Sequence, residues 1–338
     1  MSPDRKTDMV CLLGRKAGFE RVGVAPAEPL AGRGYFDLWL DRGRYGEMDY
    51  LARTRELRAD PRLLLDGAKS VIVVAHQYKQ AVDTRPEHKE PNADVDADCP
   101  RGRIARYAWG RDYHRLIRKK LHRLADALRE AIDEPFETRV CVDTAPVMER
   151  ELAAAAGIGW VGKNTCVVNP RLGSYFFLGE IVTTLDLQPT TPMADRCGSC
   201  TRCLDACPTR AFIGPYKMDA TRCIAYLTIE HRGAIPQELQ PLMGDWVFGC
   251  DVCQEVCPYN RDAPPTSEPR YELDDRNPLP PRPRLETLLT WTPQQWTEYF
   301  AGSAMKRATL DMLRRNADIA YHNARNLPQQ KSTDLGGA

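Results

Sequence analysis

The segment Cys197-Gly-Ser-Cys200-Thr-Arg-Cys203-Leu-Asp-Ala-Cys207-Pro208 has four cysteines in the spacing C-x2-C-x2-C-x3-C-P. Three closely spaced thiolates bind one cubic iron–sulfur cluster, and the proline turns the chain away after the fourth cysteine. Where two such clusters lie together, the fourth cysteine of the run binds the other cluster. The segment therefore predicts a ferredoxin-like fold that holds 4Fe-4S clusters.

A second segment, Val247-Phe-Gly-Cys250-Asp-Val-Cys253-Gln-Glu-Val-Cys257-Pro258, repeats this spacing with valine where the first cysteine would stand. Cys223 is the one cysteine between the two runs and completes the ligand set. With the fourth cysteines exchanged, we expect one cluster on Cys197, Cys200, Cys203 and Cys257, and the other on Cys207, Cys223, Cys250 and Cys253.

The alternative is two structural zinc sites, because C-x2-C pairs also occur in zinc knuckles. The proline-terminated spacing and the shared fourth ligand favour clusters over zinc. Four cysteines have no ligand spacing, and we assign them no role: Cys11, Cys99, Cys141 and Cys166.

Composition excludes several classes of protein. The 338 residues include 47 Lys and Arg against 46 Asp and Glu, for a net charge of +1. No apolar run approaches the ~20 residues that a membrane-spanning helix needs. The balanced charge also argues against a globally basic nucleic-acid binder. The start of the chain shows no signal core or twin arginine, so we expect a cytoplasmic location, where clustered cysteines more often bind metal than form disulfides.

The residues on either side of the cysteines divide into three regions. Strand patterns at 70–75, 138–142 and 174–184 alternate with helical patterns at 113–128 and after residue 143. Asp143 or Thr144 is a candidate N-cap of the second helix, with Gly157 as its stop. We expect an α+β protein, with an α/β domain over 1–186, a ferredoxin-like domain over 187–265, and a proline-rich linker with C-terminal helices over 266–338.

Local charge and aromatic residues suggest where a large polyanion would bind. Residues 101–129 contain ten Lys or Arg and only two acids, which gives an otherwise neutral chain one basic face. Such a patch is consistent with RNA, although basic helix faces are more often simply solvated. In the C-terminal region, Trp291, Trp296 and Tyr299 either stack on bases or, the reading we favour, form part of the helix core.

The first domain lacks G-x-G-x-x-G and a Walker loop, so neither a dinucleotide nor a nucleoside triphosphate is indicated. Its distinctive motifs, with those of the C-terminal region, are Arg58-Ala-Asp-Pro-Arg62, Ile104-Ala-Arg-Tyr-Ala108 with Asp112-Tyr-His114, Val142-Asp-Thr-Ala-Pro146, Gly157 to Asn164, Asn169 to Glu180, Tyr226 to Arg232 and Ser303 to Ala308. Together with both cysteine runs, these motifs resemble the epoxyqueuosine reductases, a family of cobalamin-dependent iron–sulfur enzymes. The resemblance spans residues 20–325.

This resemblance implies a base-off cobalamin between the first two domains, reduced through the clusters by an electron donor that the sequence does not identify. The substrate would be epoxyqueuosine at the wobble position of tRNAs with GUN anticodons, and Asp143 would be the proton donor. The implied cobalamin contacts are Arg58, Arg106, Asp143, Val167, Asn169, Leu178, Ile224, Cys250 and Asp251. The implied tRNA contacts are His231, Arg232, Lys306 and Arg307.

Other functions remain open from the sequence alone. A corrinoid iron–sulfur reductive dehalogenase would share the architecture, but this chain lacks the usual export signal and keeps Asp143. A second alternative is an electron-transfer subunit whose large domain only docks a partner. For Asp143 itself, the alternative role is that of a helix cap. Many family members have a longer helical C-terminus, so the resemblance leaves the extent of the tRNA contacts open, and we expect a monomer.

Overall fold

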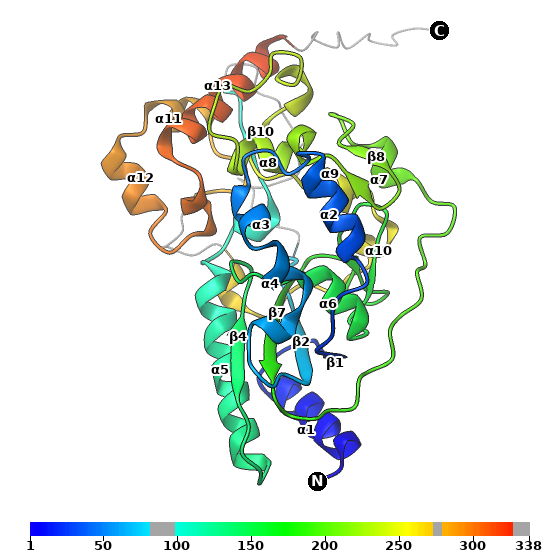
Figure 1. Cartoon of the computed structure of the whole chain (residues 1–338). Helices are drawn as coiled ribbons and strands as arrows, with labels where there is room; N and C mark the ends of the chain where they lie inside the picture. Colours follow the sequence, from blue (N-terminus) through cyan, green and yellow to red (C-terminus); the bar gives the residue numbers. More distant parts are fainter. Residues whose placement is uncertain (82–98, 273–278, 327–338) are drawn as a thin grey trace, which may run out of the picture.

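A four-stranded antiparallel sheet forms the centre of the N-terminal part of the molecule (Figure 1). The computed structural model describes residues 1–81, 99–272 and 279–326. The strands lie in the order β1 (Arg21–Pro26), β2 (Ser70–Gln77), β7 (Phe176–Thr183) and β4 (Thr138–Cys141). Every neighbouring pair is antiparallel. The α+β class is correct, but the α/β label for the first domain is wrong, because helices interleaved in sequence do not connect parallel strands here.

Helices cover both faces of this sheet. Helices α1 (Pro3–Lys16) and α5 (Tyr113–Ala131) pack on one face, and α6 (Glu149–Ala155) packs on the other. Strand β2 is buried along its whole length, as its Val-Ile-Val-Val run requires. A Cβ on Gly179 of β7 would lie 2.9 Å from Ile117, so this glycine lets α5 approach the sheet closely.

The sequence located most of these elements. Strands β2, β4 and β7 and helix α5 lie where their patterns placed them, whereas β1 was not predicted. The helix after β4 begins only at Glu149, so neither Asp143 nor Thr144 is its N-cap. Its end is as expected, since Gly157 has a φ of +65° just beyond the last turn.

The cysteine region consists of short elements. They are α7 (Arg202–Asp205), β8 (Phe212–Gly214), β9 (Lys217–Met218), α8 (Ile224–Ile229), β10 (Trp246–Phe248), α9 (Val252–Glu255) and α10 (Pro258–Arg261). Strand β10 pairs in parallel with β3 (Arg103–Ile104), which precedes α5 in the chain. The proposed first and second domains are therefore joined by backbone hydrogen bonds, and their exact boundaries stay predictions.

The C-terminal helices pack against this second region. Helices α11 (Leu285–Thr290), α12 (Pro293–Tyr299) and α13 (Leu310–Asn326) share a core with β10. Trp291 is 3% exposed and stacks on Tyr299 with ring centroids 4.8 Å apart, which confirms these aromatic residues as core. The Asn316 side chain of α13 donates to the carbonyls of Thr228 and Val247, both at 2.9 Å.

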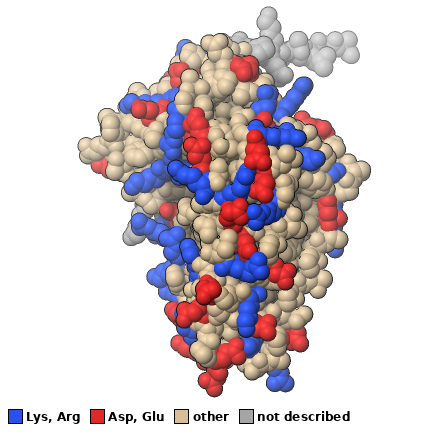
Figure 2. Space-filling view, in the orientation of Figure 1, with Lys and Arg blue, Asp and Glu red and all other residues tan. Residues whose placement is uncertain are grey.

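The surface carries its basic residues unevenly. In Figure 2, Lys and Arg side chains gather along the flank that α5 forms in Figure 1. Arg115, Arg118, Lys119 and Arg123 of α5 are exposed, while its apolar residues face the sheet. The described part of the chain contains no helix long and apolar enough to span a bilayer. Three short helices, α2 (Arg33–Asp41), α3 (Asp49–Arg53) and α4 (Arg55–Ala59), lie between β1 and β2.

Candidate active site and cluster-binding residues

Asp143 lies two residues beyond the end of β4, in a backbone conformation that side-chain-bearing residues rarely adopt. Its φ is +47°, a left-handed value that aspartate and asparagine tolerate better than most residues. Its backbone N–H donates to Glu149 Oε1 at 2.6 Å, which ties the loop to the first turn of α6. The carboxylate is 49% exposed and so remains accessible. The Asp143 carboxylate is therefore held in an accessible position. Its alternative role as the N-cap of α6 is wrong, because the N-cap is Met148.

His114 lies between two carboxylates. Its Nε2 is 2.8 Å from Asp143 Oδ2, and its Nδ1 is 2.6 Å from Asp112 Oδ1. Asp112 also caps α5, because its side chain accepts the backbone N–H of His114. Burial disfavours the imidazolium, but the hydrogen bonds to Asp112 and Asp143 outweigh burial and raise the pKa of His114 to about 9. The side chain is therefore cationic at neutral pH.

Two further carboxyl groups lie behind Asp143. Burial raises the pKa of Glu149 to about 7, and the nearby charge of Asp143 adds to this effect. Glu180, on β7, is fully buried, and neither of its carboxyl oxygens has a hydrogen-bond partner among the described residues. Burial also raises the pKa of Glu180 well above its usual value, and the nearby charges of Glu149 and Asp143 add to this effect.

Arginines and a tyrosine border the same site. Arg58 is 9% exposed, and its guanidinium donates to the Val147 carbonyl at 3.1 Å, which supports the loop that carries Asp143. The Tyr50 ring lies between two guanidinium groups, with Arg58 at 5.9 Å and Arg307 at 5.5 Å from its centroid. Arg58 is therefore a loop-supporting residue in this structure as well as a predicted cofactor contact.

Arg106 and Asp251 connect this site to the second cysteine run. The Asp251 carboxylate, 3% exposed, accepts the backbone N–H of Arg106 at 2.7 Å, and burial raises the pKa of Asp251 to about 6. The Arg106 guanidinium stacks over Trp109 and Tyr175 and has no hydrogen bond or ion pair to a described residue. Arg106 thus offers guanidinium donors next to the cysteines.

The other predicted cobalamin contacts are mostly apolar or already paired. Val167, in β6 (Val167–Val168), and Ile224 are buried, and Leu178 is half-buried. The Asn169 amide donates to the Ile158 carbonyl at 2.5 Å, and its oxygen accepts two backbone N–H groups. Because its side chain is used within the fold, Asn169 has mainly backbone groups to offer a ligand.

Several of the seven cysteines in the two runs lie near one another or near Cys223, and their division into two ligand sets stays a prediction. Burial raises the pKa of Cys203 to about 11, and the nearby thiols of Cys197, Cys200 and Cys257 contribute. Cys250 has Cys207 and Cys223 as its thiol neighbours, and Cys253 has Cys223 and Cys250. No three His, Cys, Asp or Glu side chains among the described residues converge as a single metal ion would require.

Two neighbouring side chains contact these cysteines. Trp160, at the start of β5 (Trp160–Val161), donates its indole N–H to Cys197 Sγ at 3.5 Å. The thiol of Cys166 lies close enough to the thiol of Cys253 for each to shift the pKa of the other. Cys166 therefore lies next to a proposed cluster ligand, although its place in the sequence gives no sign of this.

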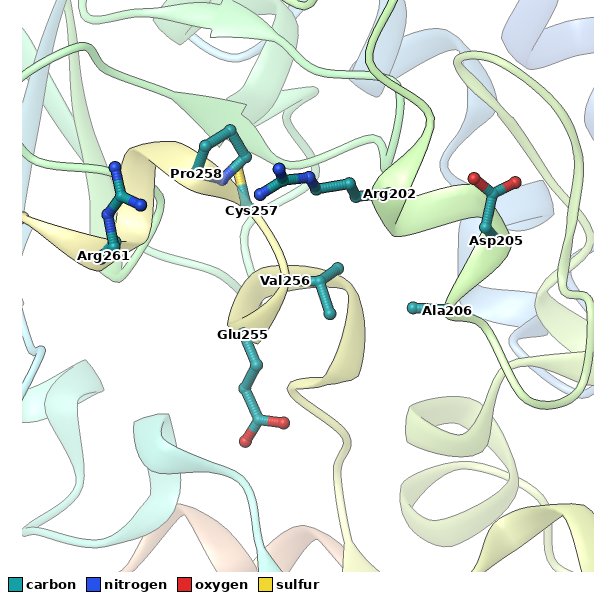
Figure 3. A pocket seen from close by; sticks show the side chains of 8 residues that line it. All are labelled: Arg202, Asp205, Ala206, Glu255, Val256, Cys257, Pro258 and Arg261. Atoms are coloured by element: carbon teal, nitrogen blue, oxygen red, sulfur yellow. The ribbon is translucent and has the colours of Figure 1, made fainter.

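A shallow hollow lies beside Cys257, between α7 and helices α9 and α10 (Figure 3). In this view the Arg202 guanidinium points toward Cys257, and Arg261 lies beyond Pro258. The floor is apolar, from Ala206, Val256 and Pro258. The proposed ligand set that includes Cys257 is therefore the one reached from solvent through this hollow.

The four predicted tRNA contacts are at the surface, and three of them contact neighbouring groups of the protein. His231 Nδ1 is 2.7 Å from Glu47 Oε1, and Arg307 forms two hydrogen bonds with Glu230, at 3.0 and 2.7 Å. The Arg232 backbone N–H also donates to Glu47, while Lys306 is exposed. Arg307 is close enough to Asp143 to be influenced by its charge, so the predicted RNA surface adjoins the carboxylate site.

Comparison with known proteins identifies the family. Residues 58–144 match the family described as epoxyqueuosine reductase QueG, DUF1730, and residues 196–260 match the 4Fe-4S double cluster binding domain. Epoxyqueuosine reductase of Pseudomonas aeruginosa is 43% identical over 328 residues, which covers 95% of this chain and 86% of that protein. The chain belongs to the epoxyqueuosine reductase family. This confirms the predicted family and oxidoreductase class and argues against the dehalogenase alternative.

Solved structures of epoxyqueuosine reductases share the fold. One contains an epoxyqueuosine-modified tyrosine tRNA stem loop and matches with a TM-score of 0.83 and 32% identity, over 95% of this chain and 82% of that chain. Another, from Bacillus subtilis, has its aspartate catalytic loop swung out of the active site and matches with a TM-score of 0.83 and 31% identity, over the same shares.

The sequence did not identify His114, Asp112 and Glu149 as site residues. Asp112 and His114 appear there only as part of a motif. The contact of His114 with Asp143 joins residues 29 positions apart in the chain, so local spacing does not indicate it. The available signal was the Asp-x-His spacing at a helix start, which places an N-cap carboxylate beside the imidazole.

Proposed function

We propose that this protein reduces epoxyqueuosine to queuosine at the wobble position of tRNAs with GUN anticodons. The observation that carries the proposal is the accessible carboxylate of Asp143, which lies near Arg307 of the predicted RNA surface. Family membership supports the reaction, and a related structure holds the modified stem loop itself. Within this family, a catalytic aspartate loop is also described for the enzyme from Bacillus subtilis.

The chain's residues suit the cofactors that this reaction needs. Two sets of four thiols fit two 4Fe-4S clusters with the fourth cysteines exchanged. The guanidinium of Arg106 and the apolar side chains of Val167, Leu178 and Ile224 fit a large amphipathic ligand such as a base-off cobalamin. Removal of the epoxide oxygen requires two electrons. When bound, cobalamin would supply this reducing chemistry at cobalt.

The protein's own residues would deliver protons and position the substrate. Asp143 would hold a proton at Oδ2 and pass it to the substrate oxygen as the carbon–oxygen bond breaks. Arg58 and Glu149 would keep the Asp143 loop in its left-handed conformation. Arg307, Lys306, His231 and Arg232 would contact the anticodon stem loop through its phosphates, which orients RNA without reading its sequence.

Electrons would pass from an external donor to the solvent-facing cluster and then to the inner cluster. The set containing Cys197 and Cys257 lies at the shallow hollow, whereas the set containing Cys250 adjoins Asp251 and Arg106. We therefore place the first set on the donor side and the second beside cobalamin. The donor itself is a reductant from outside the chain, and we expect the enzyme to act as a monomer in the cytoplasm.

The test is an anaerobic assay with chemical reductant, cobalamin and epoxyqueuosine-containing tRNA, read as the modified nucleoside. Asp143→Asn should retain clusters and cobalamin but lose about 100-fold or more of the turnover, because general acids contribute on that order. Asparagine tolerates the left-handed backbone of Asp143, so the loop should keep its shape. Exposed Asp133→Asn is the matched control and should behave as the unmodified protein does.

Two results would overturn the proposal. Near-normal turnover of Asp143→Asn would exclude the acid role. A cluster-loaded protein that never binds cobalamin and never converts the tRNA would favour the electron-transfer alternative. Cobalamin binding is measured separately, from the absorbance of the corrinoid retained after gel filtration.

A further inference from the structure

His114 is the one imidazole in the described chain that contacts Asp143, and both of its ring nitrogens are engaged. Nε2 faces Asp143 Oδ2 at 2.8 Å and Nδ1 faces Asp112 Oδ1 at 2.6 Å. The Tyr113 ring stacks on the imidazole with centroids 4.1 Å apart, which fixes its plane. This is the geometry of a proton-transfer group that is oriented from behind by a second carboxylate.

The charges around the pair come from several elements. Asp112 and Arg115 belong to the start of α5, and Asp143 and Glu149 to the β4–α6 connection. Tyrosines and arginines from other segments also lie close enough to Asp143 to interact with its charge. The titratable and charged groups that face the His114–Asp143 pair, besides Asp112, are Tyr50, Arg58, Tyr107, Tyr113, Arg115, Glu149 and Arg307.

An acid that gives its proton to the substrate has to be protonated again before the next turnover. Epoxide removal consumes two protons along with two electrons, so the site has to be recharged within each turnover. The His114 side chain is 23% exposed, which gives it a route to solvent protons. Its contact with Asp143 provides the direct transfer step.

We propose that His114 is the proton reservoir of the active site, a positioning and relay residue that reprotonates Asp143. This inference rests on the proposed function. In the step, the His114 Nε2–H bond breaks and an Asp143 Oδ2–H bond forms, as the previous Oδ2 proton bonds to the substrate oxygen. The imidazole becomes neutral and is reprotonated from solvent, while Asp112 holds the ring in place. The electrons come from the proposed cofactor chemistry, so the step transfers protons only.

The relay predicts the pH dependence of turnover. His114 holds its proton below a pKa of about 9, so the reservoir is charged at neutral pH and is lost as pH rises through that value. The wild-type rate should therefore fall above about pH 9. In Asp112→Asn, the N-cap is preserved because asparagine also caps helices, but the imidazolium loses one carboxylate partner. The high-pH decline should then move to lower pH.

Removing the imidazole gives the sharper test. His114→Ala should lower turnover by about 100-fold at neutral pH. Added imidazole should restore part of the rate, which a purely structural role does not allow. His122→Gln is the matched control, since His122 lies exposed on the same helix. A separate readout in the cobalamin-free protein is the NMR titration of His114, whose midpoint should fall in Asp112→Asn and Asp143→Asn.

The outcomes separate this inference from the proposed function. If the wild-type protein converts no epoxyqueuosine tRNA, the proposed function fails. If the wild type is active but His114→Ala keeps the wild-type rate, or loses rate with no imidazole rescue and Asp112→Asn keeps the wild-type pH profile, the relay is overturned. If the His114→Ala variant does not fold, the pH profile and the titration of Asp112→Asn decide.

Discussion

The two cysteine runs share one spacing but lie in different surroundings. In the first run, Gly198, Ser199 and Arg202 are exposed, and the short helix α7 has no buried residue. In the second, Val247 and Phe248 are fully buried in β10, and Asp251 is 3% exposed. The runs therefore differ at their starts: the first begins on the surface and the second begins in the buried strand β10, while the short helices α7 and α9 both lack buried residues.

This difference explains the missing cysteine. Val247 stands at the ligand position, but its side chain packs in the core between β10, β3 and the C-terminal helices. A thiol there would be buried in this core, so we expect the second set to take Cys223 from the N-cap of α8 instead. The second set is thereby tied to Arg106 and the candidate site, which is where an electron would be used.

The largest expected effect comes from removing the replacement ligand. Cys223→Ala should lower iron content to about one cluster's worth and abolish turnover, because the inner set then has three thiols. The first set should remain and keep its own EPR signal. Iron analysis with EPR of the reduced protein measures both.

The matched control is Cys11→Ala, since Cys11 lies far from both runs on α1 and is expected to have no role. Full iron content in Cys223→Ala would mean that Cys223 is not a ligand. The replacement of a ligand cysteine by Val247 would then not be explained by Cys223.

The sequence predicted three of the four sheet strands and proposes the cysteine sets, because both depend on local spacing. Thiols two or three residues apart reach one cluster whatever surrounds them, and the β-branched run at 70–77 specifies a buried strand. It did not predict that the four strands of the N-terminal sheet pair antiparallel, because strand direction depends on how the connections cross the sheet. For the same reason, the sequence predicted Asp143 but not the residues that contact it, His114 and Glu149.

Asp143 shows the limit clearly. Its position after a strand favours a capping role, and the resemblance alone indicates a catalytic one; the structure places the N-cap at Met148 and Asp143 beside His114. Neither is encoded in local spacing. Similarly, Cys166 has no ligand spacing, yet its thiol contacts Cys253 once the chain is folded.

A smaller effect is expected when the buried valine itself is changed. Val247→Ala removes two buried methyl groups and should lower the free energy of unfolding by about 2 kcal/mol. Val247→Cys nearly conserves volume and should cost less than about 1.5 kcal/mol, with unchanged iron content. Anaerobic urea unfolding measures the first quantity and iron analysis the second. If the thiol introduced by Val247→Cys bound the cluster in place of Cys223, burial at position 247 would not prevent ligation.

The smallest effect should distinguish the two runs electronically. The Trp160 N–H donates to Cys197 Sγ, and a donor to a cluster sulfur stabilises the reduced, more negative state. Trp160→Phe keeps an aromatic ring and removes the donor, so the reduction potential of the outer cluster should fall while that of the inner cluster stays constant. Trp291→Phe, buried among the C-terminal helices, is the control. EPR-monitored redox titration resolves the two. Equal shifts of both clusters would mean that the exchange of fourth ligands mixes them electronically, and that the outer and inner sets are not independent steps of one electron path.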